Sequence, residues 1–258
     1  MSAAPDTKAC CADVYGSAAA RFLLGDRFHP GGAALTGGLI RMLRVGPSAL
    51  VVDIASGTGT SALQLARSTR CAVIGVDLAR ANVDDATARA ARDGLAERVR
   101  FVCGDAEALP LADASVDGAL CECALCLFPD KAIAAREISR VLRPGARVAL
   151  SDVTLAGGAL PVELRSLDAY VACLGGALPL DAIAELLRGA GLVIESVVRR
   201  DDVVAELLDR VAARLRVARL VGEGPLAAHV DRAWTILEAA RDALRDGILG
   251  YGVVIARR

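Results

Sequence analysis

The chain has 258 residues, a formal net charge of −1 and 54% hydrophobic residues, which is enough apolar material for one large domain or for a core domain with a smaller appendage. Aromatic residues make up only 3% of it, which argues against stacking platforms for single-stranded nucleic acid. The near-zero charge provides no electrostatic footprint for a polyanion, so we expect no nucleic-acid partner.

The amino-terminal segment has no basic stretch followed by an apolar run, so we expect no secretory signal. No apolar run approaches the length of a membrane span. These features predict a cytoplasmic protein without a membrane partner, in which thiols stay reduced. In that compartment, eight cysteines are more typical of metal binding or catalysis than of a disulfide framework.

The first part of the chain holds the pair Cys10-Cys11, a helical pattern over residues 15–24, the turn His29-Pro30-Gly31-Gly32 and a second helical pattern over 33–43. From residue 49, strands and helices alternate. The expected strands cover residues 49–54, 72–76, 99–102, 116–121 and 147–152, and the expected helices between them cover 60–67, 82–92 and 133–142. This alternation predicts an α/β fold with a parallel sheet and right-handed crossovers.

Beyond residue 153 the pattern is mainly helical. Helices are expected over 160–172, 180–190, 202–221 and 226–245, and strands over 193–198 and 250–256. No repeat or low-complexity linker separates the two halves, so we expect the C-terminal helices to cap the same sheet.

A glycine-containing loop, Asp53-Ile54-Ala55-Ser56-Gly57-Thr58-Gly59, follows the first strand and precedes a helix. Gly57 and Gly59 allow the backbone to turn sharply and to approach a ligand. Asp77 ends the next strand, where a carboxylate can accept hydrogen bonds from both ribose hydroxyls of an adenosine. A dinucleotide-binding loop would need a third glycine, where this chain has Ala62, and the Gly-Lys-Ser/Thr of a P-loop is absent.

The loop resembles motif I of class I S-adenosylmethionine-dependent methyltransferases, with Ala55 in place of the first glycine. Gly104-Asp105-Ala106 resembles the adenine-contacting motif of that family, and the segment 140–145 resembles its turn into strand five. The resemblance implies a Rossmann-like class I methyltransferase sheet flanked by helices, with a C-terminal helical and strand extension, and S-adenosyl-L-methionine as cofactor. The implied cofactor-binding residues are Asp53, Ala55, Gly57, Gly59, Asp77, Leu78, Asp105, Ala106 and Cys121. The alternative is an ordinary Rossmann-like domain with a chance glycine loop.

Cysteines gather where the strand 116–121 ends, at positions 121, 123 and 126. Ligands bind at the carboxyl ends of strands in α/β proteins, and thiols suit a soft, thiophilic ligand. The segment 123–131 resembles the Asn-Cys-Val-Ile-Asn-Leu…Asp-Lys stretch of arsenite methyltransferases, with Glu122 replacing the Asn. The segment 173–178 resembles their second thiol motif, Cys-x-Gly-Ala-Leu, and residues 246–252 resemble the tail of their relatives.

This second resemblance implies methyl transfer to trivalent arsenic, a small-molecule metalloid substrate, with Cys123 and Cys173 as the catalytic thiols. The family's Tyr-Gly-Cys-Gly segment is Tyr15-Gly16-Ser17 here, so Cys10 and Cys11 are the candidate source of a third arsenic ligand. A thiol reductant, glutathione or thioredoxin, is the implied co-substrate. The lone pair of As(III) needs no side-chain base, which fits a chain with two histidines.

We divide the chain into an N-terminal thiol-bearing and cofactor-covering segment, a Rossmann-like cofactor-binding core, and a substrate-binding C-terminal region that completes the sheet. Their bounds are 1–45, 46–155 and 156–258. Two rival functions stay open: a methyltransferase for a small organic molecule, and a catalytically inactive, thiol-rich metalloid-binding protein.

Several residues have simpler interpretations. Cys71 and Cys103 lie on strands and are expected to be buried apolar fillers. Cys121 is expected to line the cofactor pocket through its backbone. Cys126 is a spare thiol or a core filler, although Cys123-x-x-Cys126 has zinc-knuckle spacing without the second pair that such a site needs. His29 either borders the methionine end of the cofactor or is a structural turn residue.

Overall fold

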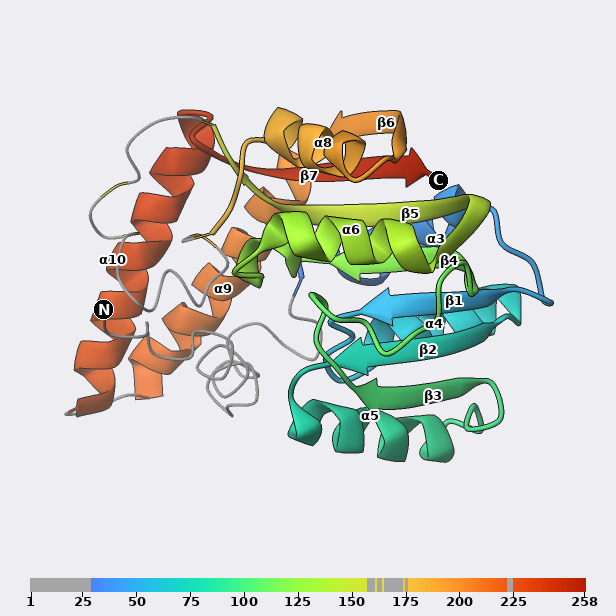
Figure 1. The fold of residues 1–258 in the computed structure, drawn as a ribbon. Helices are drawn as coiled ribbons and strands as arrows, with labels where there is room; N and C mark the ends of the chain where they lie inside the picture. The colour runs from blue at the N-terminus through green and yellow to red at the C-terminus, as the bar shows by residue number, and fades with distance from the viewer. Residues whose placement is uncertain (1–28, 157–160, 162–163, 165–173, 175, 222–224) are drawn as a thin grey trace, which may run out of the picture.

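Figure 1 shows the computed structural model of the chain, which describes residues 29–156, 161, 164, 174, 176–221 and 225–258. The helix predicted over 15–24 and most of the helix predicted over 160–172 lie outside the described residues. So do three cysteines of the predicted arsenic site, Cys10, Cys11 and Cys173.

The described helices and strands follow the predicted order along the chain. The strands are β1 (Leu50–Ile54), β2 (Ala72–Asp77), β3 (Val99–Cys103), β4 (Val116–Glu122), β5 (Leu142–Leu155), β6 (Val193–Arg199) and β7 (Leu249–Arg257). The helices are α3 (Gly32–Leu43), α4 (Thr60–Thr69), α5 (Arg80–Arg92), the 3₁₀ turn η1 (Leu125–Leu127), α6 (Lys131–Val141), α8 (Leu180–Gly189), α9 (Asp201–Val221) and α10 (Pro225–Arg245).

The seven strands form one sheet in the order β3-β2-β1-β4-β5-β7-β6. The first five strands are parallel, and β7 runs antiparallel to both of its neighbours. This arrangement confirms the predicted Rossmann-like class I methyltransferase sheet. The first strand along the chain, β1, lies in the middle of the sheet. Strands β2 and β3 follow on one side of it, and β4 and β5 on the other. The strand order therefore reverses between β1 and β4, and a ligand crevice is expected at this switch point.

Apolar side chains cover both faces of the sheet, which is why the inner strands read as continuous hydrophobic runs. Val51 and Val52 of β1 are both fully buried, and they belong to the clusters on opposite faces. Helices α3, α4 and α5 contribute to one cluster, and α6 and α8 contribute to the other. Figure 1 shows these helices layered on the sheet. The buried clusters hold the strands in place and fix the positions of their carboxyl ends.

Strand β5 begins earlier than the sequence pattern predicts. The turn Pro144-Gly145 was expected to precede the strand, but Leu142 already pairs with Val116. The pairing then shifts, and Gly118 lies opposite Arg147. Pro144 and Gly145 therefore lie in an irregular part of the β4–β5 pairing and not before the strand. Gly145 adopts φ 84° there, and its N–H donates to the carbonyl of Arg258.

Helices α9 and α10 pack against each other beside the end of the sheet (Figure 1). Their contact has a small core of its own around Leu215 and Leu237, and the Arg216 guanidinium lies 5.8 Å from the centroid of the Trp234 ring. Among the described residues, no helix is both long and apolar enough to cross a membrane.

Candidate functional site

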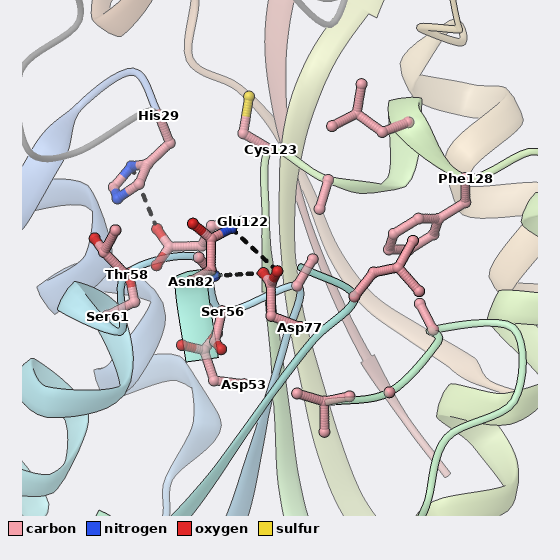
Figure 2. Close-up of a pocket in the computed structure, with 18 of the residues that line it drawn as sticks. His29, Asp53, Ser56, Thr58, Ser61, Asp77, Asn82, Glu122, Cys123 and Phe128 are labelled. Atoms are coloured by element: carbon pink, nitrogen blue, oxygen red, sulfur yellow. Dashed lines mark hydrogen bonds and ion pairs between the residues drawn. The ribbon is translucent and has the colours of Figure 1, made fainter. Parts of the chain in front are cut away.

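A pocket opens at the carboxyl ends of β1, β2, β3 and β4, beside the switch point (Figure 2). Most of the residues predicted to bind a cofactor line it. They are Asp53, Ala55, Gly57, Asp77, Leu78, Asp105 and Ala106. His29 and Cys123 line it as well. Folding thus brings together side chains from four separate strand ends, as the sequence analysis expects of a cofactor site.

The loop after β1 turns through the left-handed region of backbone space. Ala55, Gly57 and Gly59 have φ values of 56°, 53° and 78°. A Cβ at Gly59 would lie 2.4 Å from the Phe101 ring, so Gly59 is needed for packing and does not line the pocket. A Cβ at Gly57 would meet nothing within 4 Å, so its backbone lies open on the pocket wall.

Asp77 connects this loop to the end of β2. Its Oδ2 accepts from the Gly57 N–H at 2.7 Å, and its Oδ1 accepts from the Ala79 N–H at 2.9 Å and from Asn82 Nδ2 at 3.1 Å. A carboxylate has about four lone-pair positions. Three donors therefore leave about one position for a ligand. The sequence predicts hydrogen bonds from two ribose hydroxyls, which would need two positions.

The far wall of the pocket comes from the segments that follow β2 and β3. Leu78 is 41% exposed, so it offers an apolar surface to a ligand. Asp105 Oδ1 accepts from the Glu107 N–H at 2.9 Å, which orients the carboxylate beside Ala106. This combination of an apolar face and an acceptor is the environment that the adenine-contacting motif predicts.

Two further carboxylates lie in the pocket wall, Asp53 from β1 and Glu122 from β4. Asp53 is 2% exposed; burial, followed by the negative charge of Glu122, raises its pKa well above the ordinary value. Within the described residues, four buried side-chain atoms lack a hydrogen-bond partner: Asp53 Oδ2, Glu122 Oε1, His29 Nε2 and Ser56 Oγ. All four residues line this pocket. Unsatisfied buried polar atoms are rare, so their concentration here indicates a pocket shaped for a polar ligand.

His29 and Glu122 face each other on the pocket wall, as Figure 2 shows. His29 Nδ1 lies 3.7 Å from Glu122 Oε2 and 3.1 Å from the carbonyl oxygen of Pro30. Thr36, on α3, donates from Oγ1 to Glu122 Oε2 at 3.1 Å. In the sequence, Glu122 stands out only as a replacement for Asn, although its place directly after a predicted strand marks it as a candidate pocket residue.

Other polar residues of the pocket could not be singled out from the sequence as site residues. They are Ser56, Thr58, Thr60, Ser61 and Asn82. The signal available for Ser56 and Thr58 was their place in the glycine-containing loop.

The three cysteines near the end of β4 are not equivalent. Residues two apart in a regular strand face the same side. However, β4 ends at Glu122, and Cys123 adopts φ 52°, so its side chain leaves that alternation. Cys121 and Cys126 are buried in core clusters and do not line the pocket, whereas Cys123 does. Burial, followed by the charge of Asp152, raises the pKa of the Cys121 thiol well above the ordinary value.

The backbone around Cys123 is fixed by neighbouring strands. The Cys123 N–H donates to the Ser151 carbonyl on β5 at 2.7 Å. Ser151 Oγ in turn lies 3.1 Å from the hydroxyl of Tyr251, a fully buried residue of β7. A non-glycine residue at positive φ costs about 1–3 kcal/mol, and such strain concentrates at functional sites. The strand neighbours hold Cys123 in this conformation at the pocket wall.

Cys71 is fully buried, as predicted, but the prediction for Cys103 is wrong because that residue is exposed. Cys103 is the last residue of β3, beyond the buried Val99 and Phe101 of the same face, and its Sγ donates to the Leu78 carbonyl oxygen at 3.3 Å. The described residues contain no group of three His, Cys, Asp or Glu side chains arranged to hold a metal ion, so they give no support to a zinc site at Cys123 and Cys126.

Known proteins resemble this chain in sequence and fold. A family of methyltransferase domains matches residues 52–150. The 27-O-demethylrifamycin SV methyltransferase of Amycolatopsis mediterranei is 30% identical over 219 residues, which cover 84% of this chain and 71% of that protein. An arsenite methyltransferase of Halobacterium salinarum is 32% identical over 158 residues, which cover 60% of this chain and 40% of that protein.

A solved structure, the geranyl diphosphate C-methyltransferase of Streptomyces coelicolor A3(2), has the same fold, with a TM-score of 0.79 at 18% identity. That similarity covers 99% of this chain and 100% of the other. In contrast, the chain spans less than half the length of the first curated relatives it matches by sequence.

Proposed function

The chain belongs to the class I S-adenosylmethionine-dependent methyltransferases, and we propose that its methyl acceptor is trivalent arsenic held by cysteine thiolates that include Cys123. The observation that carries this proposal is the place of Cys123 on the wall of the pocket, in a left-handed backbone conformation that turns it away from the face of Cys121.

The residues present fit S-adenosylmethionine. Asp77 retains capacity for a ribose hydroxyl, while Leu78, Asp105 and Ala106 form a wall suited to adenine. The unpartnered polar atoms of Asp53, Ser56 and Glu122 suit the charged methionine end. When bound, this cofactor supplies a methyl group on a sulfonium, which a nucleophile can displace.

The role of Cys123 follows from the softness of its sulfur. Thiolates bind soft ions such as As(III) and leave the arsenic lone pair available as the nucleophile. The chain then contributes proximity and orientation, because no proton needs to be removed from the reacting atom. A thiol on the wall of the cofactor pocket is sufficient for one of these contacts with arsenic.

A second thiolate from Cys173 is supported by its neighbours in the chain, although Cys173 lies outside the described residues. Leu174 is 6% exposed and belongs to the same core cluster as Cys126, against which Cys123 also packs. Gly176 lies so close to the Cys126 carbonyl that a Cβ there would be 2.0 Å from its oxygen. Consecutive Cα atoms are about 3.8 Å apart, so the chain that leads from Cys173 meets the Cys123–Cys126 segment within a few residues.

The proposal predicts that Cys123→Ser abolishes methyl transfer to arsenite and leaves cofactor affinity unchanged, because serine lacks the soft ligand atom. The assay incubates the protein with labelled S-adenosylmethionine, arsenite and glutathione and separates the methylarsenicals, with cofactor affinity measured by calorimetry. Cys173→Ser is expected to behave in the same way. Cys103→Ser is the matched control, since that thiol is exposed outside the pocket.

The same assay separates the remaining thiols and the rival functions. Replacing both Cys10 and Cys11 should impair inorganic arsenite, which takes three thiolates, more than a monomethyl arsenical, which takes two. Full activity of Cys123→Ser would overturn the proposal. Arsenite binding without turnover in the wild-type protein would support a metalloid-binding protein that has lost catalysis.

A small organic acceptor is the second candidate. It is favoured by the rifamycin methyltransferase, a relative that aligns over 84% of this chain and whose name gives an organic substrate. Methyl transfer to such a molecule that is unaffected by Cys123→Ser would support this candidate over arsenic.

A further inference from the structure

Methyl transfer to arsenic needs no side-chain base, yet the pocket contains a buried pair of ionisable groups. His29 is 8% exposed, the Glu122 side chain is 4% exposed, and both line the pocket that also contains Cys123. Figure 2 shows them facing each other on the same part of the wall. Buried polar atoms without a partner call for an explanation, and each of the two side chains has one, His29 Nε2 and Glu122 Oε1.

The neighbours of His29 fix which ring nitrogen carries the proton. Nδ1 lies 3.1 Å from the carbonyl oxygen of Pro30, which can only accept a hydrogen bond. Nδ1 is therefore the donor in the neutral ring, and the lone pair lies on Nε2. Nε2 has no hydrogen-bond partner, so the imidazole retains a basic nitrogen that no protein group occupies.

Glu122 is placed to stabilise the imidazole once it has gained a proton. Its Oε2 lies 3.7 Å from His29 Nδ1, and the hydroxyl of Thr36 that donates to it is also 3.1 Å from the Gly32 carbonyl. One hydroxyl proton shared between two acceptors leaves the carboxylate poorly satisfied. A positive charge on His29 would supply the missing partner.

We propose that His29, oriented by Pro30 and supported by Glu122, is a general base that enables this pocket to methylate the acidic hydroxyl of a small phenol. Nε2 takes the hydroxyl proton, the phenol oxygen forms the new bond to the methyl carbon, and the methyl–sulfur bond breaks to leave S-adenosylhomocysteine. His29 then returns the proton to solvent. The inference rests on the methyl-transfer pocket of the proposed function, but not on arsenic as the acceptor.

A phenol is the hydroxyl class that best suits this wall. A general base is most effective when its conjugate acid is about as strong an acid as the group that it deprotonates. Phenols are far closer in acidity to an imidazolium ion than aliphatic alcohols are. Ala124 and Leu127, which follow Cys123 in the chain, add apolar surface to the pocket on which an aromatic ring can lie.

The first test uses 4-nitrophenol, whose absorbance reports its ionisation, with protein saturated with S-adenosylhomocysteine so that no turnover occurs. The bound phenol is expected to ionise at lower pH in the wild-type protein than in His29→Gln, with Glu122→Gln in between. Cys103→Ser, outside the pocket, should match the wild type. The melting temperature of each variant shows whether it has folded.

The second test measures labelled methyl transfer to 4-nitrophenol and to arsenite. His29→Gln should reduce transfer to the phenol by about 10²-fold or more, the usual contribution of a general base, and should reduce transfer to arsenite far less, because the arsenic lone pair needs no base. Methylation of the phenol but not of arsenite would refute the arsenic proposal and support this one. If the wild-type protein neither ionises nor methylates the phenol, or if His29→Gln chiefly weakens S-adenosylhomocysteine binding, the pair is not a base and this inference is wrong.

Discussion

At the scale of single residues, the pocket depends on backbone conformations that are costly elsewhere. Ala55 and Cys123 both have positive φ, and both follow the end of a strand. In each case the chain turns directly after the strand, so the residue that follows, Ser56 or Ala124, lines the pocket. Strain of this kind is the cost of placing a ligand site at the edge of a tightly packed core.

Asp53 provides a prediction about pH. Burial, followed by the charge of Glu122, raises its pKa in the folded protein above the unfolded value. Its contribution to stability is therefore fully present below the ordinary carboxylate pKa and is lost as pH rises through the raised value. Asp53→Asn should remove this loss, so the free energy of unfolding of the variant relative to the wild type should increase with pH. Urea unfolding across a pH series measures the difference.

Asp117 is the matched control, because its pKa shift has the opposite sign. Burial raises its pKa, but the Leu50 N–H and Arg143 outweigh this and lower it overall. Its stabilisation is present above the ordinary pKa and is lost as pH falls through the lowered value. Asp117→Asn should therefore cost stability at neutral pH and less in acid. Parallel pH profiles for the two variants would show that Asp53 does not ionise as described.

The residues that motifs define could be predicted from the sequence, and those that depend on folding could not. Gly57, Asp77 and Asp105 each follow a predicted strand in a motif of known spacing. His29 and Glu122 are separated by about a third of the chain, so their contact depends on the packing of α3 against the sheet. A short-range sequence pattern therefore cannot predict that contact.

At the scale of elements, the connection from β4 to α6 decides which thiol reaches the pocket. The Lys131 ammonium donates to the carbonyls of Cys126 and Phe128, at 3.2 and 2.9 Å, and so closes the turn that contains η1. Cys126 N–H also donates to Asp152 Oδ2 at 2.9 Å. These bonds hold Cys126 in the core while Cys123, three residues earlier, stays at the pocket.

Gly176→Ala tests the close approach of the following segment to this connection. Its Cβ would lie 2.0 Å from the Cys126 carbonyl oxygen, a backbone atom, so one of the two segments must move. Overpacking of this kind costs about 1–3 kcal/mol of unfolding free energy. Chemical denaturation measures this cost, and the arsenite assay should show reduced turnover because the segment that contains Cys123 and Cys126 lies at this contact.

Gly189→Ala is the control for that prediction. Gly189 ends α8, and a Cβ there would meet nothing within 4 Å. Since alanine favours a helix over glycine, this variant should be as stable as the wild type or slightly more stable. Equal stability of the Gly176 and Gly189 variants would contradict the tight contact at Cys126.

The elements show where sequence patterns lose information. Continuous apolar runs bounded by turns predicted β1 and β2 to within a residue. The start of β5 was missed because Pro144 and Gly145 indicate a turn locally, whereas the pairing of Leu142 with Val116 is a long-range contact. Cys103 was expected to be buried because it lies on a strand, and it shares a face with the buried Val99 and Phe101, but it is the last residue of β3 and is exposed.

At the scale of the whole molecule, the alternation of strands and helices predicted a parallel sheet but not its order. The order places β1 and β4 side by side with their carboxyl ends at one edge, and this brings Asp53 and Glu122 into one pocket. The antiparallel β7 then fills the place between β5 and β6. Tyr251 of β7 lies opposite Val153 of β5. Its hydroxyl hydrogen-bonds to Ser151, the residue whose carbonyl accepts from the Cys123 N–H.

The central claim is that this pocket binds S-adenosylmethionine through Asp77, and calorimetric titration with S-adenosylhomocysteine tests it most directly. The wild-type protein should bind one equivalent. Asp77→Ala should weaken binding by about 1.5–3 kcal/mol, the usual value for a hydrogen bond to a charged group. The melting temperature without ligand controls for the loss of the Gly57 and Asn82 contacts to that carboxylate. Absence of binding by the wild-type protein, or undiminished affinity in a folded Asp77→Ala variant, would contradict the account.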